Sequence, residues 1–221
     1  MEFKNTQVFN FEGALRGMRN PLNSWAKSDS KITWEYGEMP HYEIGPNDMD
    51  LARRLIAGGT EHRKFLRQIF VSVDITAPLY WWKEFDTYKV GTTANSTSTM
   101  HKLASIPITL ECFETDDYDD SLPIGYVLGQ KDAANVGIFV DDFISFLEEL
   151  RQKYNETKDK AYWKELVRWL PNGWLQTRTV TMNYENLRSM YHQRHTHKLT
   201  EWHAFCHWVE DLPYAKELII D

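Results

Sequence analysis

The stretch Ile69-Phe70-Val71-Ser72-Val73-Asp74-Ile75-Thr76-Ala77-Pro78 decides the fold. Every second residue from 69 to 75 is β-branched and apolar, whereas two of the three residues between them are polar. This period of two predicts a strand over residues 69–76, with one face buried more fully than the other. Pro78 suits the first turn of a following helix. We expect that helix to run through Leu79, Trp82, Lys83 and Asp86.

Upstream of this strand, residues 7–11 alternate weakly and predict a strand, and residues 11–18 predict a helix. Residues 19–47 carry prolines and scattered aromatic residues, so we expect irregular structure there. Asn47 is a suitable N-cap for a helix over 48–57, which Gly58-Gly59 would end.

Downstream, residues 90–101 have no periodicity and are crowded with serine and threonine. Residues 103–113 predict another strand. Residues 114–120 contain five acidic residues in seven, a pattern that favours a solvated loop over a metal site.

From Phe139 onward the pattern becomes helical. Apolar residues recur at i, i+3, i+4 and i+7 over 143–150, and similarly over 162–169, where Pro171 ends the helix. Residues 183–192, 199–209 and 213–220 predict three more helices. Strands in the first half and helices in the second indicate an α+β or mixed α/β fold in one domain spanning residues 1–221.

The composition excludes several classes of protein. With 221 residues, no repeat and no linker, the chain is long enough for a sizeable core. A net charge of −7 argues against broad nucleic-acid binding. No apolar run approaches the roughly 18 residues of a membrane helix, and the start lacks the apolar segment of a signal peptide. Two cysteines are too few for a disulfide framework, so we expect a cytoplasmic protein without a membrane partner.

Histidines cluster between His192 and His207, where five of the eight lie. His203 and His207 are four residues apart on an expected helix, a spacing that can bind a metal, but no HExxH pattern accompanies them. Histidines that only form hydrogen bonds are therefore the favoured interpretation. Cys206 is favoured as a buried, inert thiol over a nucleophile.

Two features point to an anionic small molecule. Over residues 178–207 the chain has a local excess of cations: Arg178, Arg188, Arg194 and Lys198. Arginine grips phosphate with two hydrogen bonds. The small hydroxyl residues of 92–99 can form a backbone nest for a phosphate. A solvated helix face and a plain turn are the alternative interpretations, and no P-loop or Rossmann pattern is present.

The order of these pieces resembles the flavin-dependent thymidylate synthases. Ile75-Thr76-Ala77-Pro78 stands at the family's Ala-Pro pair, which joins a strand to a helix. With one inserted residue, 93–101 overlies the family loop Ser-x-Asn-Glu-x-Ser-x-Arg-Tyr. That alignment keeps Asn95 and Ser98 and places Thr93 at the first serine.

The second half resembles the family more closely. Glu165-Leu166-Val167-Arg168 precedes Leu170-Pro171, as in the family's Glu-x-x-Arg before Leu-Pro. Asn183 follows the proline by twelve residues, and Arg194 follows Asn183 by eleven, as the family's asparagine and nucleotide-binding arginine do. His62 falls near the family's upstream histidine.

The chain also departs from the family pattern. The Arg-His-Arg signature, which contacts flavin and nucleotide, is replaced by Thr87-Tyr88-Lys89. The loop glutamate becomes Ser96, and the loop arginine becomes Met100. The arginine two residues past the asparagine becomes Glu185. The fold therefore transfers more readily than the activity.

The resemblance implies a single domain of the thymidylate synthase complementing protein type, with a mixed sheet in the first half and a mostly helical second half. It implies methylation of dUMP to dTMP with methylene-tetrahydrofolate, FAD and NADPH, in a homotetramer with flavin between subunits. The implied nucleotide contacts are Arg168, Arg194, Thr93 and Ser98. The implied flavin contacts are His62, Tyr88, Lys89, Asn95 and Asn183.

Under this resemblance no side chain is a required nucleophile, because the flavin carries the reaction. Two alternatives stay open. One is a decayed homologue that acts as a binding or assembly protein, and the other is a flavin enzyme that makes a different modified pyrimidine nucleotide.

Overall fold

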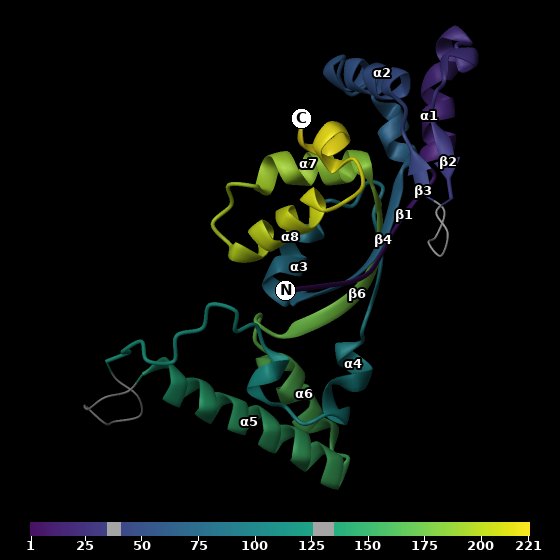
Figure 1. Ribbon diagram of the computed structural model, residues 1–221. Coiled ribbons are helices and arrows are strands. Elements are labelled where there is room, and N and C mark those ends of the chain that lie inside the picture. Colours follow the sequence, from purple (N-terminus) through teal and green to yellow (C-terminus); the bar gives the residue numbers. More distant parts are fainter. Residues whose placement is uncertain (35–40, 126–134) are drawn as a thin grey trace. The chain divides into compact units, whose positions relative to one another are not determined.

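A computed structural model of the chain contains a four-stranded sheet with the strand order β1-β4-β6-β5. The structure describes residues 1–34, 41–125 and 135–221 (Figure 1). The strands are β1 (Glu2–Phe9), β2 (Lys31–Thr33), β3 (His41–Glu43), β4 (Phe70–Pro78), β5 (Thr93–Ser96) and β6 (Leu175–Asn183). The helices are α1 (Phe11–Arg19), α2 (Pro46–Ala57), α3 (Leu79–Phe85), α4 (Thr99–Lys102), α5 (Val136–Thr157), α6 (Lys160–Trp169), α7 (Tyr184–Arg194) and α8 (Thr200–Glu210). The fold class is mixed α/β, as the sequence predicts.

None of the helices in the described ranges has both the length and the apolar character needed to cross a bilayer.

The chain divides into two compact units, each built from several segments. The first unit comprises residues 1–2, 76–84 and 96–178, and the second comprises residues 3–75, 85–95 and 179–221. Strands β4 and β6 contribute residues to both units, so neither unit is a continuous piece of chain. One domain over residues 1–221 stays a prediction.

Strand β4 forms where the alternating pattern predicts it. Val71, Val73 and Ile75 are fully buried, and the polar residues between them are half-buried. Branching at Cβ restricts these side chains to rotamers that pack well on a pleated surface. The confirmed strand begins one residue later than expected, because the N–H of Ile69 donates to the carbonyl of Leu66 at the end of the preceding 3-10 turn, Lys64–Gln68.

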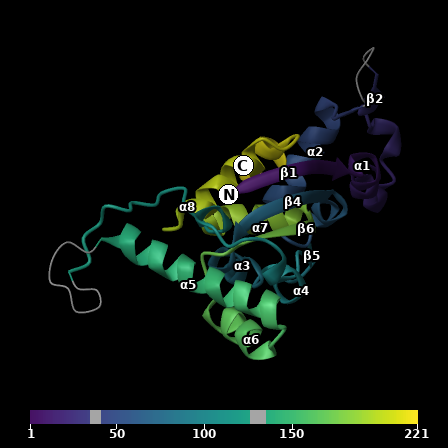
Figure 2. The same cartoon turned by 90° about the horizontal axis from the view of Figure 1, so that it is seen from below.

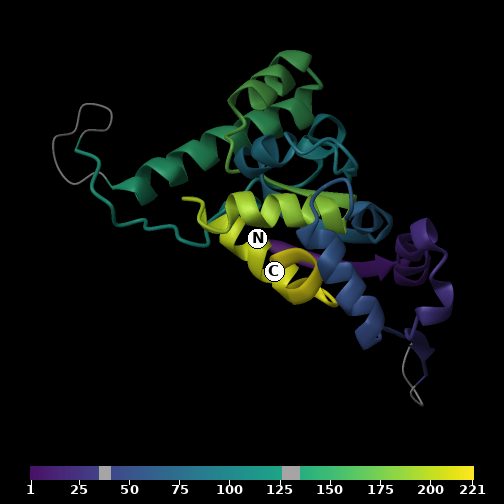
Figure 3. The same cartoon turned by 90° about the horizontal axis from the view of Figure 1, so that it is seen from above.

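In the second unit, helix α8 packs through aromatic rings. Phe3 of β1 stacks on Trp208 with 5.1 Å between ring centroids, and Trp202 meets Phe205 edge-on at 5.5 Å. The indole N–H of Trp208 donates to Thr6 Oγ1 at 3.1 Å. These contacts hold α8 against β1, and α7 and α8 lie side by side (Figure 3).

A buried ion pair joins α1 to α2 in the same unit. Arg19 Nε donates to Asp48 Oδ1 at 2.5 Å, and both side chains are buried. The hydroxyls of Ser28 and Ser30 donate to Asp48 Oδ2 at 2.7 and 2.5 Å. Burial alone would raise the pKa of Asp48, but the hydrogen bonds from Ser30, Ser28 and Arg19 hold that pKa below its usual value. The Asp48 carboxylate therefore ties segment 28–30 to α2.

The start of α2 corrects the expected N-cap. The helix begins at Pro46 with Gly45 at the N-cap, not at Asp48 with Asn47. The carboxylate of Asp29 accepts from the backbone N–H groups of Asn47 (2.9 Å) and Asp48 (3.1 Å). A side chain from another segment thus satisfies the free N–H groups that a local cap would have taken.

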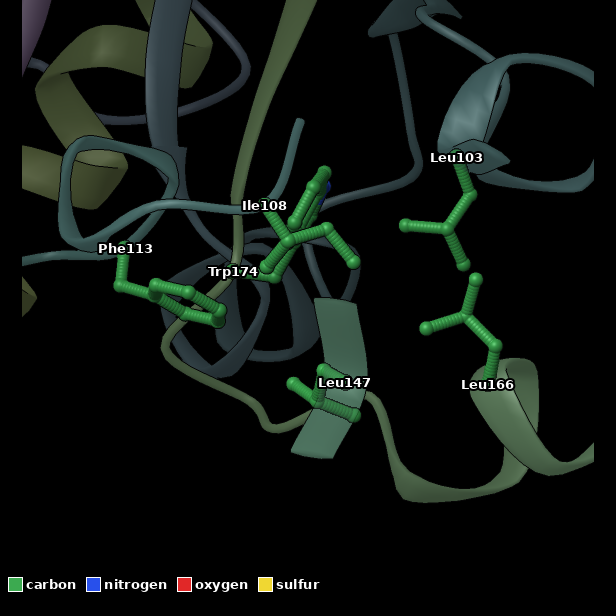
Figure 4. Packing of buried hydrophobic residues seen from close by; sticks show 6 residues of the cluster. All are labelled: Leu103, Ile108, Phe113, Leu147, Leu166 and Trp174. Carbon is green, nitrogen blue, oxygen red and sulfur yellow. The ribbon is translucent and has the colours of Figure 1, made fainter. Parts of the chain in front are cut away.

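In the first unit, α5 and α6 lie side by side (Figure 2). Leu147 of α5 and Leu166 of α6 are fully buried. They belong to a cluster shown in Figure 4 that also contains Leu103, Ile108, Phe113 and Trp174. The periodicity over 143–150 and 162–169 thus predicts both helices correctly, but only Leu147 and Leu166 of the predicted apolar positions are buried, and Phe146 and Trp169 are exposed.

The expected strand over 103–113 is wrong. This segment forms two 3-10 turns, Leu103–Ser105 and Leu110–Cys112, and pairs as a strand only through a bridge between Phe113 and Trp174. Its backbone groups bond to side chains of α5 instead of a neighbouring strand. Ile108 N–H donates to Glu148 at 2.8 Å, and Asn155 donates to the carbonyl of Ala104 at 2.9 Å.

The sequence patterns did not predict several other elements correctly. Strand β6 was not expected, because threonine and arginine interrupt its apolar alternation. Residues 19–47 are not wholly irregular, since β2 and β3 pair antiparallel with Ile32 opposite Tyr42. Residues 35–40 of that stretch lie outside the described ranges. The expected helix over 213–220 is a π-helical turn, Lys216–Ile220.

Candidate functional site along helix α7

Helix α7 begins with a capping box that fixes its first turn. The side chain of Asn183 accepts from Asn186 N–H at 3.0 Å, and the side chain of Asn186 accepts from Asn183 N–H at 3.2 Å. Two otherwise unpaired N–H groups are satisfied in this way. Asn183, an expected flavin contact, is buried and serves as this N-cap.

The turn at residues 88–91 is held against the start of α7. Asn186 Nδ2 donates to the carbonyl of Val90 at 2.6 Å, and Thr92 Oγ1 donates to the carbonyl of Tyr88 at 2.6 Å. Gly91 has a φ of +80°, and a Cβ there would lie 2.9 Å from Asn183 Nδ2. Lys89 lies exposed within this turn.

We expect Gly91→Ala to lower the free energy of unfolding by about 1–3 kcal/mol, because alanine is strained at positive φ and its Cβ would press on the capping box. Urea unfolding of the full chain measures the change. Gly59→Ala, which is also at positive φ but has open space around the added Cβ, should cost less. Equal losses in both variants would show that the contact with α7 contributes nothing.

Tyr88 and Arg194 meet at the other end of α7. Arg194 Nε donates to the hydroxyl of Tyr88 at 2.8 Å, and that hydroxyl donates to Gln193 at 3.1 Å. The guanidinium of Arg194 also lies over the rings of Trp202 (4.7 Å) and Tyr88 (5.5 Å). Contacts of a cation with two aromatic faces orient the guanidinium plane.

A cavity of about 410 Å³ lies beside α7 in the second unit. One face of the helix lines it at helical spacing, and the segment at residues 60–63 completes it. The lining residues are Thr60, Arg63, Glu185, Arg188, Ser189, His192 and Gln193.

Charge is concentrated in this cavity. Arg63 Nε donates to both carboxylate oxygens of Glu185, at 3.1 and 2.9 Å. Arg188 donates to the backbone oxygens of Ile219 (2.7 Å) and Asp221 (3.2 Å). Burial lowers the pKa of Arg188, and the charge of Arg63 lowers it further. Two guanidinium groups thus share the cavity with a single lining carboxylate.

His192 adds a ring to this cavity. Its Nε2 donates to the carbonyl of Ile219 at 3.1 Å. Burial lowers the pKa of His192, and the neighbouring Arg188 lowers it further, so the ring is neutral at physiological pH. The cavity therefore offers cations, hydroxyls and one neutral imidazole.

The remaining expected site residues lie in other places. In the second unit, Thr93 and Asn95 are exposed on β5. His62, although next to Arg63, lines a separate cavity of about 690 Å³ with Met18, Leu51 and Phe65. In the first unit, Ser98 caps α4 by accepting from His101 N–H, and Arg168 on α6 is exposed and paired with Glu165.

The structure thus brings Tyr88 and Arg194 into contact and places the turn containing Lys89 against Asn183. Sequence analysis missed Arg63, Thr60, Ser189 and Gln193. The spacing of 185, 189 and 193 along one helix face was a usable signal for two of them. Arg63 had no local signal, because its partner Glu185 is 122 residues away.

The cations expected to share one patch lie in different surroundings. Arg178 lies over the ring of Trp82 at 4.2 Å and donates to Gln176, both in the first unit. Arg188 lines the cavity, and Arg194 packs on Tyr88. Of the four expected cations, only Arg188 is among the residues that line this cavity.

The histidine cluster forms hydrogen bonds, and Cys206 is buried. His203 donates to the carbonyl of His197 at 2.7 Å, and His207 pairs with Glu210 at 3.2 Å. Within the described ranges, no three histidine, cysteine or acidic side chains are grouped as metal ligands. Burial raises the pKa of the Cys206 thiol to about 11, so the thiol is inert.

No protein-family model matches the chain, and no curated protein matches its sequence. Solved structures do match its fold. A crystal structure of the flavin-dependent thymidylate synthase ThyX from Helicobacter pylori, complexed with FAD and dUMP, aligns with 99% of this chain and 98% of that chain. The TM-score is 0.68 and the identity 14%.

This chain has the fold of flavin-dependent thymidylate synthase. A second Helicobacter pylori ThyX structure with FAD and dUMP agrees, with 96% and 94% of the two chains aligned, a TM-score of 0.65 and 14% identity. At this identity the likeness shows the fold alone. The fold that the sequence resemblance implied is therefore confirmed.

Proposed function

We propose that this protein is a divergent flavin-dependent thymidylate synthase. In this proposal it methylates dUMP to dTMP, with methylene-tetrahydrofolate as the carbon donor, reduced FAD and NADPH. The observation that carries the proposal is the fold match over nearly the full length of both chains to an enzyme whose structures contain FAD and dUMP. We also propose that it acts in the cytoplasm, as a homotetramer whose subunits share the site.

The chemistry of the donor set along α7 fits a ligand that carries phosphate groups, such as FAD or dUMP. Arg63 and Arg188 each have five N–H donors. Arg63 uses Nε on Glu185 and Nη2 on Thr60 Oγ1 (3.5 Å), and Arg188 uses Nη1 and Nη2 on backbone oxygens, so each guanidinium has further N–H donors. The hydroxyls of Thr60 and Ser189 line the same cavity. Charge-assisted hydrogen bonds from guanidinium groups are the strongest that a protein offers to phosphate.

The roles of the residues follow from this proposal. Arg194, held by Tyr88 and Trp202, would present a fixed guanidinium to the nucleotide, together with Arg168, Thr93 and Ser98. The flavin contacts would be His62, Tyr88, Lys89, Asn95 and Asn183. When bound, FAD supplies the hydride chemistry. The protein residues orient the ligands, neutralise their phosphates and exclude water.

One observation favours the second candidate, a decayed homologue that acts as a binding or assembly protein. Glu185 stands where the family has an arginine, and it binds Arg63 at 2.9 Å. A phosphate entering this cavity would meet the carboxylate as well as the two cations. If this repulsion dominates, the fold persists without the family's ligands.

Flavin binding separates the two candidates. Purified full-length protein is mixed with excess FAD, passed through a desalting column and examined for visible flavin absorbance and for mass by light scattering. We expect flavin to stay with a tetramer. A colourless protein that is strictly monomeric at micromolar concentration would contradict the shared flavin site and favour the second candidate.

A further inference from the structure

Helix α5 carries an exposed stripe of aromatic residues that the proposed function does not use. Phe143 stacks on Phe139 and lies tilted beside Phe146, with 6.2 Å between ring centroids in each pair. Phe139 is 50% exposed and Phe146 42% exposed. Val136 and Leu150 extend the stripe, so apolar residues recur at alternating steps of three and four. This spacing is the seam of a helix that packs on another helix.

The stripe borders the face of α5 that packs on the core, and two of its residues, Phe143 and Leu150, are partly buried against the core cluster. Its exposed residues are Phe139 and Phe146. Leu147, which is fully buried, and the partly buried Ile144 face the core cluster of the first unit. Successive residues of an α-helix are 100° apart around its axis. The centre of the stripe therefore lies about 100° around the helix from the face that carries Ile144 and Leu147. Figures 1 and 2 show the N-terminal half of α5 extending beyond α6. Exposed aromatic rings that recur along one helix face are typical of an interaction site.

The border of the stripe is acidic. Asp142 and Glu149 are exposed along its solvent side, seven residues apart and therefore in line with each other. The backbone N–H of Gly137 donates to the carbonyl of Asp120 at 2.9 Å, so the acidic segment 116–120 ends at the first turn of α5. Desolvation, Asp120 and Asp141 raise the pKa of Tyr118, which agrees with a negative potential there.

We propose that the stripe, through the exposed rings of Phe139 and Phe146, docks a basic amphipathic helix of a partner protein. Leucine or aromatic anchors at i, i+3, i+4 and i+7 of the partner would fill the stripe. Lysine or arginine beside those anchors would pair with Asp142 and Glu149.

Charge argues for such a partner over a second copy of this chain. Antiparallel self-pairing along this seam places residues that flank it on the same side opposite each other. Asp142 and Glu149 of one copy would then face the same carboxylates of the other. The cations of a basic helix would instead attract Asp142 and Glu149.

The probe is a synthetic helical peptide of two to three heptads, with leucine at the seam positions and lysine elsewhere. Its binding to the full chain is followed by fluorescence anisotropy. We expect Phe139→Ser/Phe146→Ser to weaken binding at least about tenfold. That variant keeps every charge, so it separates docking from simple attraction of a cationic peptide to an acidic protein. Ile106→Ser, 50% exposed but off the stripe, is the matched control and should bind like wild type.

A second variant pair tests the acidic border. Asp142→Lys/Glu149→Lys should also weaken binding at least about tenfold, whereas Glu111→Lys/Asp211→Lys, with the same change in net charge at other exposed sites, should have a smaller effect.

Three outcomes would overturn the proposal: no binding by the wild type, equal binding by the phenylalanine variant, or a wild-type dimer that the phenylalanine variant converts to monomer. The last result would show that a second copy covers the stripe. The border variants change no apolar residue, so they keep the proposal testable if the phenylalanine variant fails to fold.

Discussion

Replacing Asp48 with alanine should lower the free energy of unfolding by about 3–5 kcal/mol, the largest stability effect we expect in this chain. The substitution leaves the buried guanidinium of Arg19 without its carboxylate and removes the acceptor of the Ser28 and Ser30 hydroxyls. The guanidinium of Arg19 is too enclosed for water to replace its lost partner fully, because the residue is only 4% exposed. Equilibrium unfolding in urea measures the change.

Asp50→Ala is the matched control for this prediction, because Asp50 lies on the same helix but is 68% exposed and pairs with Arg54 across solvent. Its change should stay within about 0.5 kcal/mol. Similar losses for Asp48→Ala and Asp50→Ala would contradict the importance that we give to the buried pair.

The contribution of Asp48 should also depend on pH. Its folded pKa is depressed, so the stability it adds is present above the unfolded pKa of about 4. That stability is lost as pH falls through the folded pKa. The difference between wild type and Asp48→Ala should therefore be constant near neutrality and shrink in acid.

Replacing Arg194 with alanine should weaken dUMP binding by about 1.5–3 kcal/mol, roughly ten- to 150-fold in dissociation constant. Arg194 stands where the family's nucleotide-binding arginine does, while Met100 and Glu185 replace two other arginines. If the chain binds dUMP as we propose, binding must therefore depend more on Arg168 and Arg194 here. Calorimetric titration of wild type and variant with dUMP, with and without FAD, measures the change.

Two controls distinguish ligand contact from damage to the fold. Arg53→Ala removes an exposed arginine of α2 and should leave dUMP binding unchanged. Arg194→Lys keeps the charge but loses the planar fork, so its affinity should fall between those of wild type and alanine variant. Equal affinities of wild type and Arg194→Ala for dUMP would show that Arg194 does not contact the nucleotide.

Local sequence patterns predicted the elements whose stability comes from their own periodicity. Strand β4 and helices α5, α6 and α7 appear where alternation or helical spacing places them. The segment 103–113 failed because side chains of α5, about 40 to 50 residues away, take its backbone hydrogen bonds. Strand β6 was missed because its polar residues hide the alternation of buried Val180 and Met182.

The candidate site was predictable only where one chain segment carries it. Asn183 and Arg194 mark the two ends of α7, and their spacing is readable from the sequence. The contact of Tyr88 with Arg194 joins residues 106 apart. The family resemblance assigned Tyr88 to flavin and Arg194 to nucleotide and did not pair the two. The pairing of Arg63 with Glu185 depends on folding alone, so no sequence pattern pointed to it.

Formation of dTMP tests the proposed activity most directly. Purified full-length protein is incubated with dUMP, methylene-tetrahydrofolate, NADPH and FAD, and the nucleotides are separated by chromatography. We predict that dTMP appears and that omitting FAD abolishes it. A protein that binds both FAD and dUMP but yields no dTMP would contradict the proposed activity.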